Sequence, residues 1–384
     1  MRKATLGVIT LLLIAFISGC ISQTQTVTIT ETKTHTEYTP ITPSTTTTTS
    51  TTSTSSPIET SSTMALEEDL IKADCQNEHW RDDYEKAMIC GVQEGFNSLF
   101  LPEDLGIYTT DELKVPLEFA QYLGNNIYLD VQKENQSMIG GKYFDIKTPF
   151  ELAVEKNGTY ADFAILGAYV FLKRGLDTYI VYAETEKGFG LWPAFRIKEN
   201  YYDRIFVVYW PYLIPMTLGG AIELLDFAGD PVTKVKIYHL WLDDNHHVKA
   251  KLIATEEPGP IIPTYMMPAS NDYFDDQGWV KLNLTKKLPQ LIQEDNPNCK
   301  YVKSSDDIYY RNLKEYEINV PLLLYFYSRP YQDRWVESLA KATYELLKQQ
   351  GFDPQKCKKF TILDVIPSPY VEGGVYIRIY AEIS

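Results

Sequence analysis

A Thr- and Ser-rich segment covering residues 21–64 restricts where this chain can fold. Thr fills every even position from Thr24 to Thr36, and a pure Thr run covers positions 45–49. A segment of this composition cannot bury enough apolar surface to offset the conformational entropy lost on folding. We therefore predict a disordered stalk at 21–64, of the kind that carries O-linked sugars. The folded body is left with residues 65–384, enough for one large domain or two of ordinary size.

The N-terminus before this stalk has the layout of a secretory signal. Arg2 and Lys3 precede an apolar run from Ala4 to Phe16, which is shorter than the roughly 20 residues that a membrane-spanning helix needs. The following Ile-Ser-Gly-Cys resembles a lipobox, which implies a signal peptide at 1–20 and a lipid on Cys20. An uncleaved N-terminal anchor is the alternative. Both predict a body held at the extracytoplasmic face of a cell membrane, with the membrane as a partner through Cys20.

The net charge restricts the other partners. The chain has 36 basic and 51 acidic residues, a formal charge of −15. Nucleic-acid binding requires a basic face, and docking on anionic lipid does too. We therefore predict no nucleic-acid partner.

The cysteines of the body are typical of an oxidising compartment. Besides Cys20 there are four, an even number that favours two disulfides with three connectivities open. Pairing within each region favours Cys75–Cys90 and Cys299–Cys357. A reactive thiol is the alternative, although none of these cysteines has a neighbouring His in a nucleophile-like motif.

Hydrophobic patterning predicts helices first and strands afterwards. Residues 66–100 have a helical pattern. Thr109 and Glu112 form a capping-box pattern, which predicts a helix that Gly124 would stop. The clearest helix follows Gly158, with an apolar stripe at 163, 166, 167, 170 and 171, ending at Gly175. β-branched and aromatic runs then predict strands at 178–183, 191–197, 204–210, 235–242 and 248–254. This order predicts an α+β fold with an antiparallel sheet.

A smaller unit follows. Pro-rich residues 255–275 have the composition of a surface connection. Beyond it, the pattern predicts strands at 320–327, 360–366 and 375–383 and a helix at 333–350. We predict a first domain at 65–256, a connector at 257–298, and a small α+β unit at 299–384.

Two stretches carry a resemblance to a known family. The first is Thr148-Pro-Phe-Glu-Leu, and the second is Asn157-Gly-Thr-Tyr-Ala-Asp-Phe-Ala, which leads into a helix ending in Lys-Arg-Gly-Leu. Together they resemble the core of the transglutaminase-like superfamily, which has a papain-like fold. The similarity covers about residues 110–225. It implies a helix whose N-terminal residue is a catalytic Cys, followed by strands that carry a His and an acid.

The chain departs from that pattern at all three roles. Tyr160 occupies the Cys position, Gly190 or Leu191 the His position, and Tyr209 or Trp210 the acid position. A phenol titrates near 10 and is a poor nucleophile at neutral pH. The resemblance therefore implies a degenerate domain in a surface lipoprotein of archaeal type, with no catalytic residues, no cofactor and no acyl-transfer chemistry by this route.

A vacated groove would be lined by aromatic side chains. Tyr160, Trp192, Tyr209 and Trp210 would gather there, and aromatic faces bind glycans and peptides well. The simpler interpretation is that these rings fill the vacated site as core. Two alternative functions stay open: a hydrolase that uses carboxylates in the same groove, and a solute-binding component of a transporter.

Three weaker candidates complete the sequence. Asp243, Asp244, His246 and His247 share a turn and could bind a metal ion, although a solvated hairpin tip is the simpler interpretation. Asn271, Asp272, Asp275 and Asp276 contain an acidic cluster that lacks the Gly and Glu of an EF-hand, with incidental calcium binding as the alternative. We predict no metal site. Sequons at Asn135, Asn157 and Asn283 are candidate glycosylation sites.

Overall fold

The computed structural model describes residues 70–199, 202–257, 269–303 and 313–384. The predicted signal peptide, the predicted lipidation site Cys20 and the predicted stalk lie outside these residues. Within the described ranges, no helix has both the length and the hydropathy needed to cross a bilayer.

The first part of the structure is mainly helical. Its elements are η1 (Glu78–Asp82), α2 (Tyr84–Asn97), η2 (Pro102–Leu105), α3 (Lys114–Asn126), β1 (Tyr128–Leu129), α4 (Val131–Gly140), α5 (Pro149–Glu155), β2 (Asn157–Gly158) and α6 (Tyr160–Lys173). The helix predicted after Gly158 is α6, and it ends as predicted. Gly175 has a φ of +78°. The amides of Gly175 and Leu176 bond back to Leu172 and Phe171 at 3.0 Å each, which is a Schellman ending.

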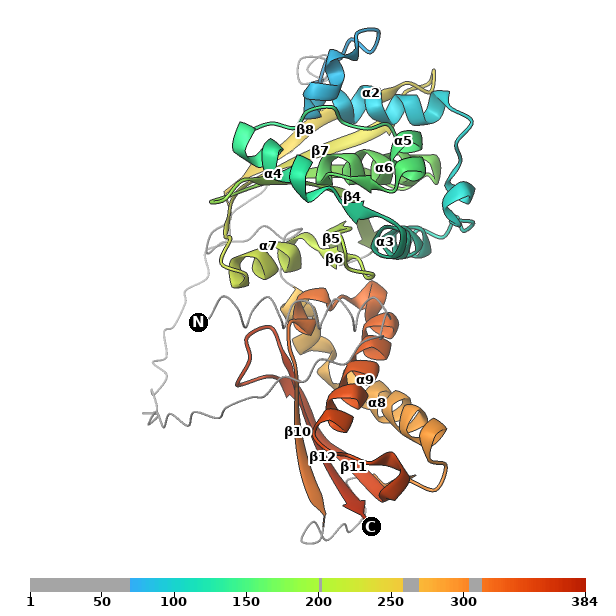
Figure 1. The fold of residues 1–384 in the computed structure, drawn as a ribbon, viewed down its shortest axis with the longest axis vertical. Coiled ribbons are helices and arrows are strands. Elements are labelled where there is room, and N and C mark those ends of the chain that lie inside the picture. Colours follow the sequence, from blue (N-terminus) through green and yellow to red (C-terminus); the bar gives the residue numbers. More distant parts are fainter. Residues whose placement is uncertain (1–69, 200–201, 258–268, 304–312) are drawn as a thin grey trace, which may run out of the picture. The chain divides into compact units, whose positions relative to one another are not determined.

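A six-stranded antiparallel sheet follows, so the fold is α+β as predicted. Its strands are β3 (Thr178–Thr185), β4 (Phe189–Glu199), β5 (Tyr202–Val207), β6 (Met216–Thr217), β7 (Val232–Leu242) and β8 (Val248–Glu256), and α7 (Leu218–Phe227) separates β6 from β7. The order across the sheet is β6-β5-β4-β3-β7-β8. Helix α6 packs along β4, and α2 packs on α6 (Figure 1).

The C-terminal part has a sheet of its own. Its elements are α8 (Ala269–Asp295), β9 (Lys300–Tyr301), β10 (Lys314–Val320), η5 (Leu323–Phe326), η6 (Arg329–Tyr331), α9 (Gln332–Gln349), η7 (Pro354–Lys356), β11 (Cys357–Pro367) and β12 (Val375–Ile383). The strand order is β10-β12-β11-β9, and α8 packs beside α9 (Figure 1). The alternation predicted for β12 is present, because Val375, Ile377, Ile379 and Ala381 are all fully buried.

The six-stranded sheet has a core on each face. Ile180, Leu191 and Phe195 point to the α6 face and join the core built by the N-terminal helices. Val181 and Trp192 point the other way and join a core that continues into α7, α8 and α9. Strand alternation divides β3 and β4 between these two cores.

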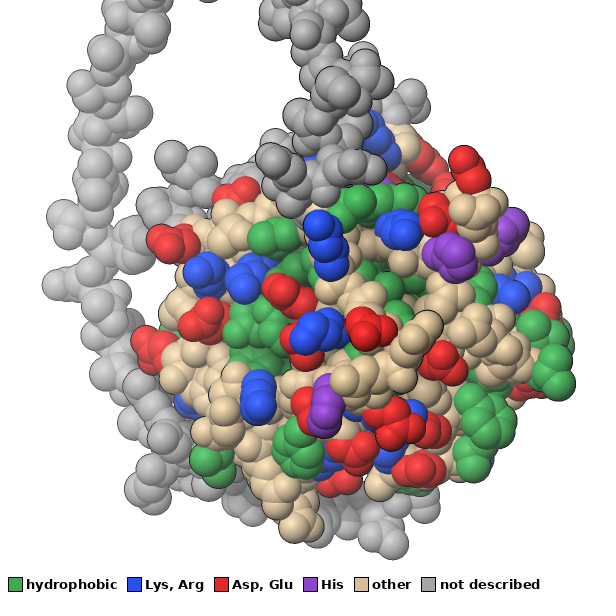
Figure 2. Space-filling model, turned by 90° about the horizontal axis from the view of Figure 1, so that it is seen from above, with side chains coloured by type: hydrophobic (Ala, Val, Ile, Leu, Met, Phe, Trp, Pro, Cys, Tyr) green, Lys and Arg blue, Asp and Glu red, His purple; other side chains and the backbone are tan. Residues whose placement is uncertain are grey.

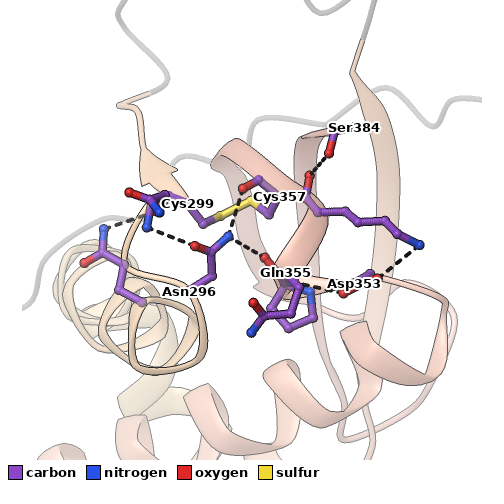
Figure 3. The surroundings of a disulfide bond; sticks show 10 residues. Asn296, Cys299, Asp353, Gln355, Cys357 and Ser384 are labelled. Atoms are coloured by element: carbon purple, nitrogen blue, oxygen red, sulfur yellow. Dashed lines mark hydrogen bonds and ion pairs between the residues drawn. A yellow bond between two sulfur atoms is a disulfide. The ribbon is translucent and has the colours of Figure 1, made fainter.

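Both favoured disulfides are present. Cys75 and Cys90 are joined, as are Cys299 and Cys357. The second bridge ties the start of β9 to the start of β11. Beside it, the side-chain amide of Asn296 donates to the carbonyls of Pro354 at 2.8 Å and Cys357 at 3.1 Å (Figure 3).

Three local predictions are wrong. The strand expected at 320–327 is only the end of β10 followed by the 3-10 turn η5. Pro321 cannot donate to a strand ladder, and Leu322 has a φ of +61°, so the chain turns there and buries the apolar run on all sides.

The helix expected from the Thr109 and Glu112 pattern begins later, at Lys114. Asp111 accepts hydrogen bonds from the amides of Leu113 and Lys114 at 3.0 and 3.1 Å and so organises the start of the helix. Gly124 does not stop α3, which runs to Asn126. A Cβ at Gly124 would lie 2.4 Å from Leu213, so this glycine permits close packing instead.

Candidate functional site

The candidate site is built around the N-terminus of α6. Thr159 caps this helix in a reciprocal capping box with Asp162, and Tyr160 is its first residue. Asp162 is fully buried and also accepts the amide of Lys147 at 2.7 Å. These hydrogen bonds hold the first turn of α6, which carries Tyr160, in place.

Three of the four predicted groove aromatics come together there. The Tyr209 ring lies 5.8 Å from the Tyr160 ring and 5.3 Å from the Trp192 ring, measured between centroids. Tyr209 continues to Tyr212 at 5.8 Å, and Tyr212 to Phe326 at 4.7 Å. The cluster is therefore continuous with the core on that face of the sheet.

The three rings of this cluster differ in solvent exposure. Trp192 is 3% exposed, while Tyr160 and Tyr209 are half-buried and pack against the core. Burial raises the pKa of Tyr209 to about 12. Burial, followed by the nearby Tyr209 and Glu134, raises the pKa of Tyr160 well above its usual range. Both phenols are therefore neutral at physiological pH.

The other positions predicted from the resemblance lie on different faces of the six-stranded sheet. Leu191 packs in the core on the α6 face. A Cβ on Gly190 would lie 3.4 Å from Nε1 of Trp192, on the opposite face. Trp210 packs against the core on the α6 face. Its ring lies 6.3 Å from the Phe163 ring, and its Nε1 donates to the Ile127 carbonyl at 2.9 Å.

Sequence reasoning missed a buried carboxylate at this helix end. Glu134 of α4 is 3% exposed, and its Oε2 accepts the backbone amide of Tyr160 at 3.0 Å. Its Oε1 accepts the hydroxyl of Tyr143 at 2.8 Å. No signal in the sequence marked Glu134, because it lies in a polar helix 26 residues before its partner.

The two acids at this helix end have raised pKa values. Burial raises the pKa of Glu134 above its usual value, and its hydrogen bonds from Tyr160 and Tyr143 oppose that effect. Burial also raises the pKa of Asp162, against the hydrogen bonds it accepts. When ionised, the two carboxylates place negative potential where the helix dipole alone would supply positive potential.

The part of the chain that contains this site is similar to a known family. Residues 101–238 match the family model described as a transglutaminase-like domain. The match begins before η2 and ends within β7, so it contains the α6 start and strands β3 to β5. No curated protein matches the sequence.

The cysteines of the described residues are unavailable as nucleophiles. Cys75, Cys90, Cys299 and Cys357 are all oxidised in the two disulfides. No free thiol is therefore present among the residues that the structure describes.

The hairpin and acidic candidates have structural partners. In the turn between β7 and β8, Asp243 accepts the amides of Asn245 and His247 at 2.9 Å each. Asp275 and Asp276 pair with Arg329 at 3.0 and 3.2 Å. Across the described ranges, no group of three or more His, Cys, Asp or Glu side chains is arranged to hold a metal ion.

The sequons differ in their surroundings. Asn135 is exposed on α4, but Ser137 of its sequon is buried. Asn283 uses its side-chain amide within α8, donating to Trp279 at 2.9 Å. Asn157 is exposed and accepts from Lys147 Nζ at 2.9 Å. Their glycosylation stays a prediction.

Proposed function

We propose that this chain is a lipid-anchored extracytoplasmic protein whose transglutaminase-like domain binds a peptide or glycan without catalysing acyl transfer. The Ile-Ser-Gly-Cys sequence that ends at Cys20 supports the lipid anchor, and the Thr- and Ser-rich composition of residues 21–64 supports the stalk. The buried carboxylate at the N-terminus of α6 supports the absence of catalysis.

The observation that carries the proposal is the bond between Glu134 and the Tyr160 amide. A catalytic Cys at a helix N-terminus depends on positive potential to favour its thiolate. Here the buried Glu134 carboxylate accepts that amide at 3.0 Å, and a phenol replaces the thiol. The potential is therefore adverse to an anionic nucleophile, whichever residue occupies position 160.

A carboxylate-based hydrolase finds less support. Such an enzyme needs two acids that face a cleft about 5–10 Å apart, one of them with a raised pKa. Glu134 and Asp162 do have raised pKa values, but they are 3% and 0% exposed and engaged with backbone amides. A hydrolytic water would have no access to either carboxylate.

The solute-binding alternative finds less support too. Two similar α/β lobes around a hinge would be needed. The described residues instead form one six-stranded antiparallel sheet, one four-stranded sheet with a different order, and the short pair β1-β2. A binding domain of another kind is favoured.

The proposal is tested by comparing wild-type protein with Tyr160→Cys and with the double change Tyr160→Cys plus Glu134→Gln. We expect no transfer from a glutamine-containing donor peptide to a primary amine in any of the three. The thiol of the single variant should react slowly with iodoacetamide at pH 7, and Glu134→Gln should accelerate that reaction by lowering the pKa of the thiol.

One variant serves as the control, and two results would contradict the proposal. Tyr160→Ser reports any reaction of iodoacetamide with other groups. Amide transfer by wild-type protein that is lost in Tyr160→Phe would refute the proposed inactivity. Equal alkylation rates in the single and double variants would refute the role given to Glu134.

A further inference from the structure

A row of three aromatic rings lies on the six-stranded sheet, on the face opposite α6. His239 of β7 is the register partner of Tyr179 of β3, and Trp241 is the next residue of β7 on the same face. The His239 ring lies 4.9 Å from the Tyr179 ring at an interplanar angle of 30°. It lies 5.3 Å from the Trp241 ring at 28°. We call these three residues the ring row.

The ring row opens toward solvent at one end. Tyr179 is buried at 3% exposure, the His239 side chain is 34% exposed, and Trp241 is partly exposed. The buried ring holds the row in place, and the two outer rings carry surface for a ligand.

Hydrogen-bonding groups border the row. Asp177 accepts from His239 Nε2 at 3.1 Å and from the Tyr179 hydroxyl at 3.0 Å, and its side chain is still 47% exposed. Next to it, Arg196 makes two bonds of 2.7 Å to Asp203 and is 29% exposed. The rings are therefore flanked by partly exposed carboxylates and a guanidinium of fixed orientation.

The charges around the row are balanced in pairs. Arg196 faces Asp203, and Lys249 lies 3.4 Å from Asp243, while the Asp177 carboxylate accepts from the His239 ring. Such pairing offers no surplus positive charge to a phosphate or carboxylate, and the body as a whole is acidic. A neutral ligand that presents apolar C–H faces and many hydroxyls matches both the rings and their border.

The row also lies near the point where the described chain begins. Lys251 of β8 is the register partner of His239, and it bridges Leu70 on its other side. The amide of Ile71 bonds to the Ala250 carbonyl at 3.0 Å. The end of the body that leads to the predicted anchor is thus attached beside the strand that carries the row.

We propose that the ring row is a binding site for a neutral saccharide, with a sugar ring over Trp241 and His239 and its hydroxyls on Asp177 and Arg196. This inference rests on the proposed function and names its ligand class. It places the site on the β3–β7 face and not at the Tyr160 cluster, where Trp192 is in the core and Tyr160 and Tyr209 pack against it.

The test uses the full chain in a zwitterionic detergent that carries no sugar. Neutral oligosaccharides of glucose, mannose, galactose and N-acetylglucosamine are screened by saturation-transfer NMR, and affinities of binders are measured by calorimetry. Trp241→Ala should weaken binding several-fold to about tenfold, while Trp241→Phe should retain most of it. Asp177→Asn should weaken binding as well.

The matched control is Tyr370→Ala, which removes a tyrosine that is 69% exposed in the C-terminal part. It should bind like wild-type protein, and thermal melting confirms that each variant is folded. The inference is overturned if no neutral oligosaccharide binds, if sulfated ones bind better, or if Trp241→Ala binds normally. Binding lost in Tyr209→Ala but kept in Trp241→Ala would also overturn it, yet would leave the proposed binding function standing.

Discussion

At the residue scale, the N-terminus of α6 shows how two buried acids change the charge at a helix end. The fold supplies a helix N-terminus, which attracts an anion. Glu134 and Asp162 occupy that end with buried carboxylates that accept the amides of Tyr160 and Thr159. Two acids now use the positive potential that a thiolate would need.

These acids make stability depend on pH. The pKa of each is raised in the folded state, from unfolded values of about 4.3 for Glu and 3.9 for Asp. The folded state therefore binds more protons above pH 4, so the free energy of unfolding falls as pH rises through that range. Glu134→Gln should reduce this fall, measured by urea denaturation between pH 4 and 8.

The control for this measurement is Glu186→Gln, which changes an exposed carboxylate in the turn between β3 and β4. Its pH dependence should follow wild-type protein. If Glu134→Gln also follows wild-type protein, Glu134 is not titrating as a buried acid.

At the element scale, α6 illustrates how tightly the central helix approaches the sheet. A Cβ at Gly167 would lie 2.3 Å from Cβ of Pro193 and 2.8 Å from the Phe119 ring. Gly167→Ala should therefore overpack the α6–β4 contact and cost about 1–3 kcal/mol of unfolding free energy.

A second helical glycine provides the comparison for that prediction. Gly278 of α8 is exposed, and a Cβ there would meet nothing within 4 Å. Gly278→Ala should stabilise the protein by about 0.5–1 kcal/mol, because alanine loses less backbone entropy on folding. Guanidinium denaturation of both variants measures the difference, and equal effects would show that the Gly167 contact is looser than described.

Helix α8 also shows why some elements escape sequence reasoning. Val280, Leu284, Leu288 and Ile292 recur at helical spacing and are all fully buried. Pro289 lies inside the helix, and the Pro-rich residues before 269 extended the apparent connection into it. Local composition suggested a break where tertiary packing on α9 maintains a helix of 27 residues.

At the scale of the whole molecule, the predicted anchor sets where the body works. If Cys20 carries a lipid, Cys20→Ser should release the protein from the membrane fraction into the medium, because one substitution removes the attachment chemistry. Cell fractionation and labelling with a radioactive fatty acid measure this outcome.

Ser22→Ala, two residues beyond the predicted lipid site, is the control and should leave the protein in the membrane fraction. If Cys20→Ser protein stays in the membrane fraction at the full molecular mass, the N-terminus is an uncleaved anchor. Lipidation would then be wrong, although the body would still be tethered.

The sequence by itself determined the features that depend on neighbours along the chain. Period-two and helical patterning located α6, the β7–β8 hairpin and β12, and the motif around Asn157 led to a domain type that the family model matches over 101–238. Cysteine spacing led to both disulfides. Each of these signals lies within a short segment or in the chemistry of a single residue type.

Only the tertiary structure decided which distant side chains meet. It separated Gly190 from Leu191 by strand face, brought Glu134 to the Tyr160 amide, and aligned Tyr179 with His239 across two strands that are far apart in sequence. Such contacts depend on sheet order and register, which no local pattern specifies. The α6 site and the ring row therefore became visible only when the strands were in place.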